Sequence, residues 1–344
     1  MRVAGGMLVG PDSRVHTTFG HNPSSLRLCS FDPNLQNIPR SDDDPSAIAN
    51  YVKEIFVAPA GHAFWERDFS AIEAVLVGYF AGSARYTRFA KLGVHDFLNS
   101  HMVGRPADLS WSDRDLKDYF KELKRTDGPT RQKAKKVVHA SNYMMTPRGM
   151  HNHEPEAFPD VKSAAKLQGI YFELFPEIRR WHRDLAIRVD GTKVRPGAMG
   201  ELQEPVDPWS LGVCYARNPF GYVHHFYNVL DWEKINNEWF SSFGQDAPRL
   251  VSFLPQSTAA AIIKKAAKRI YYDFPQVGET LRLLIHDSIF GEAREREIDE
   301  CLRVSAEVME APIQELPLDP AWGMGEFLTI NTEAKVGKSW GSMH

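Results

Sequence analysis

The segments of this chain that have the pattern of β-strands lie near its two ends, and the residues between them have the pattern of helices. Residues 62–68 predict one strand, and the stretch TLRLLIHDSIFGE predicts two short strands that meet at His286 and Asp287. Helical spacing dominates from residue 70 to about residue 187, and a strong helix is predicted over residues 257–274. Any sheet must therefore be assembled from distant pieces, which predicts an α+β fold.

The composition is that of a soluble globular protein with enough apolar residues for two or three subdomains, since 43% of its 344 residues are hydrophobic and 25% are charged. No stretch approaches the roughly 20 apolar residues of a membrane span, and the first residues lack the apolar core of a signal peptide. We therefore expect a cytoplasmic protein. Cys29, Cys214 and Cys301 have no CxxC or zinc-ligand spacing, so neither disulfides nor a structural zinc site is expected.

The charge of the chain excludes a simple DNA-coating protein. Its formal net charge is −3 and its pI is near 6.5, whereas many phosphate contacts demand a basic surplus. Any nucleic-acid site must therefore be local. Basic residues do gather in residues 117–136, although such a run is also typical of a solvated helix face. These residues are Lys117, Lys121, Lys124, Arg125, Arg131, Lys133, Lys135 and Lys136.

Four polar side chains recur at steps of four along a helix predicted over about residues 130–145, with Pro129 at its start and Pro147 beyond its end. They are Arg131, Lys135, His139 and Tyr143. At about 3.6 residues per turn they form one stripe. Cations suit a triphosphate and a flat ring suits a nucleobase, so the stripe predicts a nucleoside triphosphate lying along the helix. The alternative is an exposed basic face that grades into a half-buried tyrosine.

One carboxylate ends the first strand and another lies between the two later strands. Because both strands belong to one presumed sheet, the fold can bring Asp68 and Asp287 together. Two such carboxylates could hold two Mg²⁺ ions roughly 3.5–4 Å apart, as phosphoryl transfer requires. The HDS triplet by itself has two alternatives, a buried His–Asp hydrogen bond or half of a hydrolase triad. No GxSxG elbow accompanies it, which disfavours the triad.

The same residues carry a resemblance to a known family. DFSAIE, the helix with Arg131, Lys135 and Tyr143, and HDS resemble, in order, motifs A, B and C of the family A (polymerase I type) DNA polymerases. The resemblance runs from about residue 12 to the C-terminus and includes SLRLCSFDPNLQNIPR, PQSTAAAIIKKA, YFELFPEIRRWHR and GKSW. It implies a divergent, phage-like portion with right-hand architecture: an antiparallel palm sheet (residues 1–84 and 241–344) and helical fingers (residues 85–240), with thumb and exonuclease domains absent.

The resemblance also implies roles for individual residues in template-directed addition of dNMP to a primer 3′-hydroxyl. Asp68 and Asp287, with the Phe69 carbonyl, would bind two Mg²⁺ ions, for which Mn²⁺ is an expected substitute. Lys135 would grip the triphosphate and protonate pyrophosphate. Glu73 would exclude a 2′-hydroxyl, although Ser70-x-x-Glu73 is also a helix capping box. The implied dNTP-binding residues are Glu73, His95, Arg131, Lys135, His139 and Tyr143, and the implied DNA-binding residues are Arg27, Asn34, Gln36, Asn37, Gln256 and His286.

Several positions depart from the family pattern. His139 stands where an aromatic residue is usual, Met144 replaces a glycine, Ser252 an asparagine and Ser288 the glutamate of motif C. The expected partners are primer–template DNA and dNTPs. A thumb or exonuclease would come from a separate chain, unless the sequence is a fragment or a compact enzyme. The alternative function is a non-catalytic replication subunit that binds DNA or a partner; a metal-dependent nuclease would leave the stripe unexplained.

Overall fold

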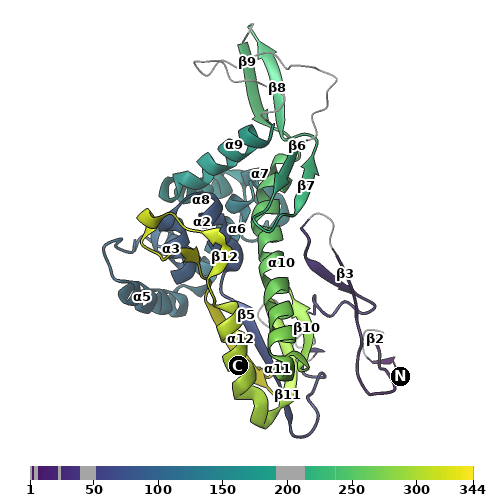
Figure 1. Ribbon diagram of the computed structural model, residues 1–344. Coiled ribbons are helices and arrows are strands. Elements are labelled where there is room, and N and C mark those ends of the chain that lie inside the picture. Colours follow the sequence, from purple (N-terminus) through teal and green to yellow (C-terminus); the bar gives the residue numbers. More distant parts are fainter. Residues whose placement is uncertain are drawn as a thin grey trace. The chain divides into compact units, whose positions relative to one another are not determined.

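The structure is a computed structural model that describes residues 2–3, 7–21, 25–38, 52–190, 214–236 and 238–343 (Figure 1). The chain divides into two compact units, residues 1–72 with 256–344 and residues 73–255. The predicted divisions at residues 84 and 240 concern palm and fingers and stay predictions. Among the helices of the described ranges, none is long and apolar enough to cross a membrane.

The first unit is built on a four-stranded antiparallel sheet in the order β10-β11-β5-β14 (Figure 1). Its strands are β5 (His62–Phe69), β10 (Leu281–Ile285), β11 (Ser288–Arg294) and β14 (Thr332–Gly337). β5 is central, and both its neighbours come from the far end of the chain. This confirms the α+β class and the prediction that the sheet is assembled from distant pieces.

Alternation along β5 separates two buried faces. On one face Phe64 belongs to an apolar cluster with Phe290 of β11. On the other face Arg67 Nε donates a 2.8 Å hydrogen bond to Ser305 Oγ. The indole of Trp65 lies against Gly291, where a Cβ atom would come within 2.3 Å of the ring. Both faces are therefore packed, which fixes the register of the strand that carries Asp68. The apolar cluster comprises Leu35, Ile38, Phe64, Ile285, Phe290, Trp340 and Met343.

Smaller elements complete the first unit. Among them β3 pairs with β4 in a two-stranded antiparallel ribbon. These elements are β1 (Arg2–Val3), β2 (Met7–Leu8), β3 (Thr18–His21), β4 (Leu28–Phe31), α11 (Pro275–Gly278), η1 (Glu295–Glu297), α12 (Ile298–Met309), β12 (Ile313–Pro317), η2 (Pro320–Trp322) and β13 (Phe327–Leu328).

The second unit is mainly helical, with aromatic residues in its core. The rings of Phe89 and Phe97 stack at 4.0 Å, and Tyr86 packs edge-on against Phe175 at 4.9 Å. Two hairpins follow the helices, β6 (Cys214–Arg217) with β7 (Val223–Phe226) and β8 (Leu230–Ile235) with β9 (Glu238–Phe243). The helices are α2 (Ile72–Phe80), α3 (Ala84–Leu92), α4 (Val94–Met102), α5 (Asp113–Thr126), α6 (Gly128–Asn142), α7 (Pro147–His153), α8 (Val161–Leu174) and α9 (Pro176–Asp190).

Two helices differ from their predicted bounds. α10 (Ala247–Asp273) begins ten residues before the predicted start at residue 257, and Pro255 lies inside it. α6 ends at Asn142 and not near residue 145, because Met144 adopts a left-handed conformation with φ 61°. Pro129 lies in the first turn of α6, as predicted, whereas Pro147 opens the next helix, with Thr146 as its N-cap.

Candidate functional site

His286 and Asp287 form the two-residue turn between β10 and β11, where Ile285 pairs with Ser288. His286 has φ 52°, a left-handed conformation that costs free energy in a residue with a Cβ atom. The Asp287 carbonyl accepts a 3.2 Å hydrogen bond from the Phe69 N–H. Asp68 lies directly opposite Ser288. The structure thus brings Asp68 and Asp287 to one end of the sheet, with the backbone of Phe69 between them.

The Asp287 carboxylate faces a cation and remains within reach of solvent. Arg27 Nη2 lies 3.5 Å from Asp287 Oδ1, and the two side chains are 24% and 22% exposed. Arg27 and His286, both predicted to bind DNA, therefore lie beside the predicted metal-binding carboxylate. Because both side chains are partly exposed, water weakens the attraction between them, and either residue can exchange the other for a different charged group.

Glu66 is a residue of this site that sequence analysis missed. Ser288 Oγ donates a 2.7 Å hydrogen bond to Glu66 Oε1 and is itself buried. Glu66 precedes Asp68 by two residues on β5, so the two carboxylates share a face of the sheet. Glu333 of β14 lies opposite Asp68 in the register. The sequence did contain a signal for Glu66: alternate residues of a strand share a face, so Glu66 is expected on the same face as Asp68.

The oxygen donors at this end of the sheet suit a Mg²⁺ ion that is shared with substrate and water. They suit less well a metal ion whose ligands all come from the protein. Among the described residues, no group of three or more His, Cys, Asp or Glu side chains is arranged to hold a metal ion. Mg²⁺ is commonly bound through one or two carboxylates together with substrate phosphates and water. Asp68 and Asp287 supply that number of carboxylates, all with hard oxygen donors.

The segment before β5 that was predicted to touch DNA is held by its own hydrogen bonds. Gln36 is buried, and its Nε2 donates a 2.8 Å bond to the Leu284 carbonyl of β10. Asn34 Oδ1 accepts hydrogen bonds from Ser30 Oγ and from the Asn37 N–H. Asn34 and Asn37 are exposed. Gln36 therefore ties this segment to the sheet, and the two asparagines are the accessible residues of the group.

Gln256, the remaining residue predicted to bind DNA, lies on α10 and is half-buried. The neighbouring Ser257 and Thr258 are fully buried. Gln256 is therefore the more accessible of these three consecutive polar positions, although its role in binding stays a prediction.

In the second unit, the stripe on α6 faces a buried aspartate and a histidine. Arg131 holds Asp96 in a two-point ion pair, with Nε 2.5 Å from Oδ1 and Nη2 3.2 Å from Oδ2. Burial, followed by the charges of Arg131, Lys135 and His139, lowers the pKa of His95 to about 3. His95 is therefore neutral at pH 7. It can meet a phosphate only as a hydrogen-bonding group. Arg131 uses Nε and Nη2 on Asp96, so it can meet a phosphate through Nη1 or by leaving Asp96.

The C-terminal end of α6 joins three predicted nucleotide-binding residues. The Tyr143 hydroxyl donates a short hydrogen bond to Glu73 Oε2. The rings of His139 and Tyr143 meet edge to face at 5.1 Å. The interpretation of Glu73 as part of a capping box is wrong, because Ala71 has φ 53° and separates Ser70 from α2, which begins at Ile72.

A buried polar network surrounds Asn142, the last residue of α6, and sequence analysis missed it. Asn142 Oδ1 accepts hydrogen bonds from the hydroxyls of Tyr86 and Tyr171 at 3.0 and 2.5 Å. The Asn142 carbonyl accepts a 2.9 Å bond from His182 Nε2. Burial lowers the pKa of His182 to about 4, so the ring is neutral at pH 7. No spacing in the sequence links these four residues, which come from four different elements.

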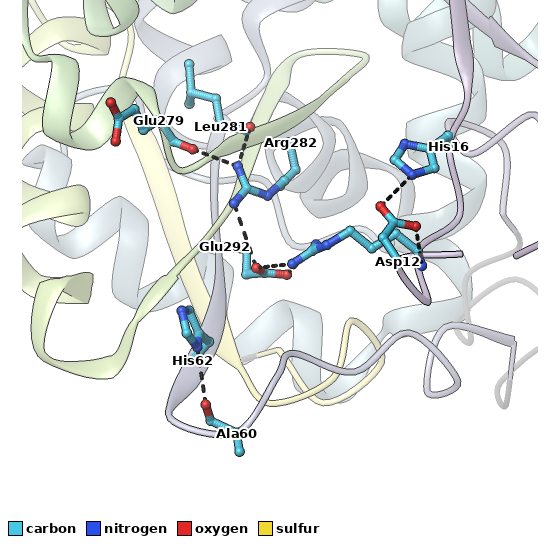
Figure 2. Close-up of polar contacts among 9 residues, drawn as sticks. Asp12, His16, Ala60, His62, Glu279, Leu281, Arg282 and Glu292 are labelled. Carbon is cyan, nitrogen blue, oxygen red and sulfur yellow. Dashed lines mark hydrogen bonds and ion pairs between the residues drawn. The ribbon is translucent and has the colours of Figure 1, made fainter. Parts of the chain in front are cut away.

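A second polar cluster in the first unit is centred on Glu292, beside Arg282 (Figure 2). Its residues line an apolar cavity of about 580 Å³. Arg14 makes hydrogen bonds of 2.8 and 2.9 Å to the two carboxylate oxygens of Glu292, and Arg282 lies 3.7 Å from the same group. Burial raises the pKa of Glu292, but the hydrogen bonds and charge of Arg14 outweigh it and hold that pKa below its ordinary value. The cluster ties the N-terminal segment to β11.

Comparison with known proteins places the chain in a family. The model of DNA polymerase family A matches residues 6–342. The chain is 26% identical over 326 residues to the thermostable DNA polymerase I of Thermus caldophilus, an alignment that covers 93% of this chain and 33% of that protein. With DNA polymerase I of Rhizobium leguminosarum the identity is 23% over 342 residues, with 96% and 28% covered. The chain thus spans about a third of the length of these relatives.

A solved structure also resembles the chain. It is the POL domain of Pol1 from M. smegmatis in complex with DNA primer-template and dNTP, with a TM-score of 0.62 and 20% identity. The match covers 97% of this chain and 49% of that one, and at this identity it shows the fold alone. Together with the family model, which matches nearly the whole sequence, these findings identify the chain as a member of DNA polymerase family A.

Proposed function

We propose that the chain catalyses template-directed DNA synthesis, transferring dNMP from a dNTP to a primer 3′-hydroxyl. One observation carries the proposal: in a chain that belongs to DNA polymerase family A, Asp68 and Asp287 lie together at one end of the central sheet. In this proposal the first unit is the palm and the second unit contains the fingers. Each unit holds one part of the machinery.

Asp68 and Asp287 would hold Mg²⁺ together with the phosphates of the incoming nucleotide. When bound, the metal ions neutralise charge that develops on the attacking and leaving oxygens. Before the nucleotide arrives, Arg27 balances the charge of Asp287 at 3.5 Å. The partly exposed pair allows Arg27 to move toward a DNA phosphate. Positioning and charge neutralisation would supply most of the rate.

Residues of the second unit would bind the nucleotide. Lys135 would meet the triphosphate and would donate a proton to departing pyrophosphate. Arg131 would contribute after exchanging the Asp96 carboxylate for a phosphate. Glu73, held by Tyr143, would present its carboxylate to the sugar and exclude a 2′-hydroxyl. The rings of His139 and Tyr143 would offer a surface to the base.

Residues of the first unit would bind primer and template. Arg27 and His286 lie beside Asp287, so they would meet DNA next to the reacting phosphate. Asn34, Asn37 and Gln256 supply further accessible polar groups. Phosphate contacts by such residues set the position of DNA without reading its sequence.

A second candidate function is a non-catalytic subunit that binds DNA or a partner. Two observations favour it: Ser288 supplies no carboxylate of its own, and Arg131 is engaged by Asp96. The polymerase proposal accommodates both, because Glu66 places a carboxylate beside Ser288 and Arg131 can exchange partners.

Primer extension separates these two functions. The purified chain would be given a labelled primer–template, four dNTPs and Mg²⁺, beside Asp287→Ala and the control Glu279→Ala, which removes an exposed carboxylate elsewhere in the same unit. We expect extension by wild type and control and none by Asp287→Ala. The opposite outcome is a wild-type chain that binds DNA but does not extend the primer, even after extracts that could supply a further chain are added. That outcome would refute the polymerase proposal and support the binding subunit.

A further inference from the structure

One face of the β6–β7 hairpin presents aromatic rings and a cation to solvent. Tyr215 pairs with His225 across the two strands, and Arg217 pairs with Val223. In an antiparallel pair, residues directly opposite each other point to the same side, so these four side chains share one face. All four are exposed. Tyr227 continues the same alternation beyond β7 and is 65% exposed.

The opposite face of this hairpin is buried, which makes the hairpin a firm support. Phe226 lies in the core, its ring 5.9 Å from Phe253 of α10, and His224 stacks on Phe253 at 5.5 Å. Asn218 closes the turn, since its Oδ1 accepts hydrogen bonds from the N–H groups of Phe220 and Tyr222. The exposed rings therefore stand on a packed two-stranded ribbon.

The charge of the hairpin complements phosphate. Residues 214–227 contain one arginine and two histidines but no aspartate or glutamate, whereas acidic residues outnumber basic ones in the whole chain, 44 to 41. Arg217 makes no ion pair within the described part of the chain. Across the strands the rings of Tyr215 and His225 are 6.1 Å apart. Flat rings next to an unpaired cation favour a ligand with flat faces and negative charge.

We infer that the face formed by Tyr215, Arg217, Val223, His225 and Tyr227 binds single-stranded nucleic acid. Unstacked bases would lie on the rings of Tyr215, His225 and Tyr227, and Arg217 would meet the backbone phosphates. A duplex fits less well, because its bases already stack on one another. The inference rests on the proposed function in one respect: the strand bound in the cell would be the unpaired part of a template.

The test measures binding of a fluorescein-labelled oligothymidylate by anisotropy, with EDTA and without dNTP, so that no catalytic step is needed. Because base stacking on aromatic rings supplies much of the affinity for a single strand, Tyr215→Ser with Tyr227→Ser should weaken binding roughly tenfold or more. Arg217→Ser should lower the slope of log affinity against log salt by about 0.7. Tyr272→Ser, which removes a tyrosine that is 69% exposed on α10, is the matched control and should bind like wild type.

Unchanged affinity in the double variant, or an equal loss in Tyr272→Ser, would overturn the inference. A wild-type chain with no affinity for single strands would overturn it too and would leave a protein partner as the occupant of this face. Because the assay contains EDTA and no dNTP, it measures binding separately from primer extension. Failure of primer extension with intact binding would therefore count against the proposed polymerase activity and leave this surface in place.

Discussion

The hydroxyl of Ser288 donates a 2.7 Å hydrogen bond to the carboxylate of Glu66, from β11 to β5, at the end of the sheet where Asp68 and Asp287 lie. The family pattern has a glutamate at the position of Ser288. In this chain the carboxylate next to that position comes from the neighbouring strand. Its charge lies on the same face as Asp68, where it contributes to the field around any bound cation.

Glu66→Gln removes this charge and keeps an oxygen that accepts the hydrogen bond. We expect the Mg²⁺ concentration for half-maximal extension to rise about tenfold, within the range seen when groups around a metal site are altered. Ser288→Ala removes the hydrogen bond but keeps the charge of Glu66, so it should raise this Mg²⁺ concentration less. Glu279→Gln, which removes an exposed carboxylate elsewhere in the same unit, is the control; an equal shift there would show a general charge effect.

The bond between Tyr143 and Glu73 predicts how the sugar is selected. Tyr143→Phe removes the hydroxyl that holds the Glu73 carboxylate, so this side chain gains rotational freedom. We expect discrimination between dNTP and rNTP, measured as the ratio of kcat/KM values, to fall roughly tenfold, equivalent to about 1.4 kcal/mol. Glu73→Ala should lower it further. Discrimination that is unchanged in Tyr143→Phe would mean that the hydrogen bond does not position Glu73.

The ion pair between Arg131 and Asp96 is expected to stabilise the fold and to hinder the binding of dNTP by Arg131. Arg131→Ala leaves the buried Asp96 carboxylate unpaired, which should cost about 3–5 kcal/mol of unfolding free energy in urea titrations. Asp96→Asn releases Arg131 and should lower KM for dNTP. If Asp96→Asn raises KM instead, Arg131 acts as a structural residue and does not contact the triphosphate.

The low pKa of His182 predicts a pH dependence of stability. The folded chain keeps His182 neutral down to about pH 4, whereas an unfolded histidine binds a proton near pH 6.5. The unfolded state therefore holds more protons in this interval, and stability falls as the pH drops from about 6.5 to about 4. His182→Gln keeps a donor for the Asn142 carbonyl without titrating. Its Tm should fall less over this interval than that of wild type, and parallel curves would contradict the assignment.

The buried network around Asn142 can be tested through a single hydroxyl. Tyr171→Phe leaves the ring packing intact and removes one of the two donors to Asn142 Oδ1. We expect a loss of about 1–3 kcal/mol in unfolding free energy. Tyr119→Phe, which removes a hydroxyl on the surface of α5, should lose much less. Equal losses in the two variants would show that the buried hydrogen bond contributes no more to the free energy of unfolding than the surface one.

The sequence predicts those parts of the fold that depend on local pattern. The strand that ends at Asp68, the turn at His286 and Asp287, and the proline-bounded start of α6 all follow from alternation and turn chemistry. The start of α10 was predicted ten residues too late. The helix continues through Pro255 in the structure, since a proline inside a helix is tolerated when packing outweighs the lost hydrogen bond.

Relationships that depend on three-dimensional packing could not be read in this way. Asn142 and His182 meet only because two helices pack, and Asp96 takes hold of Arg131 from another helix. Glu66 was within reach of a period-of-two argument once residues 62–68 were accepted as a strand. For these residues, chemistry alone does not distinguish a ligand-binding group from one already satisfied inside the protein.

The central position of β5 also has a consequence for biosynthesis. Both strands that flank it lie far later in the sequence, so most of its backbone hydrogen bonds must wait until β11 and β14 have been synthesised. Residues 73–255 form their own compact unit and can fold while the ribosome is still working. Long-range strand pairing is slow because loop closure comes first. Assembly of Asp68 with Asp287 is therefore expected after residues 73–255 have folded, and a chain stalled before β11 would expose β5 as an unpaired strand to chaperones.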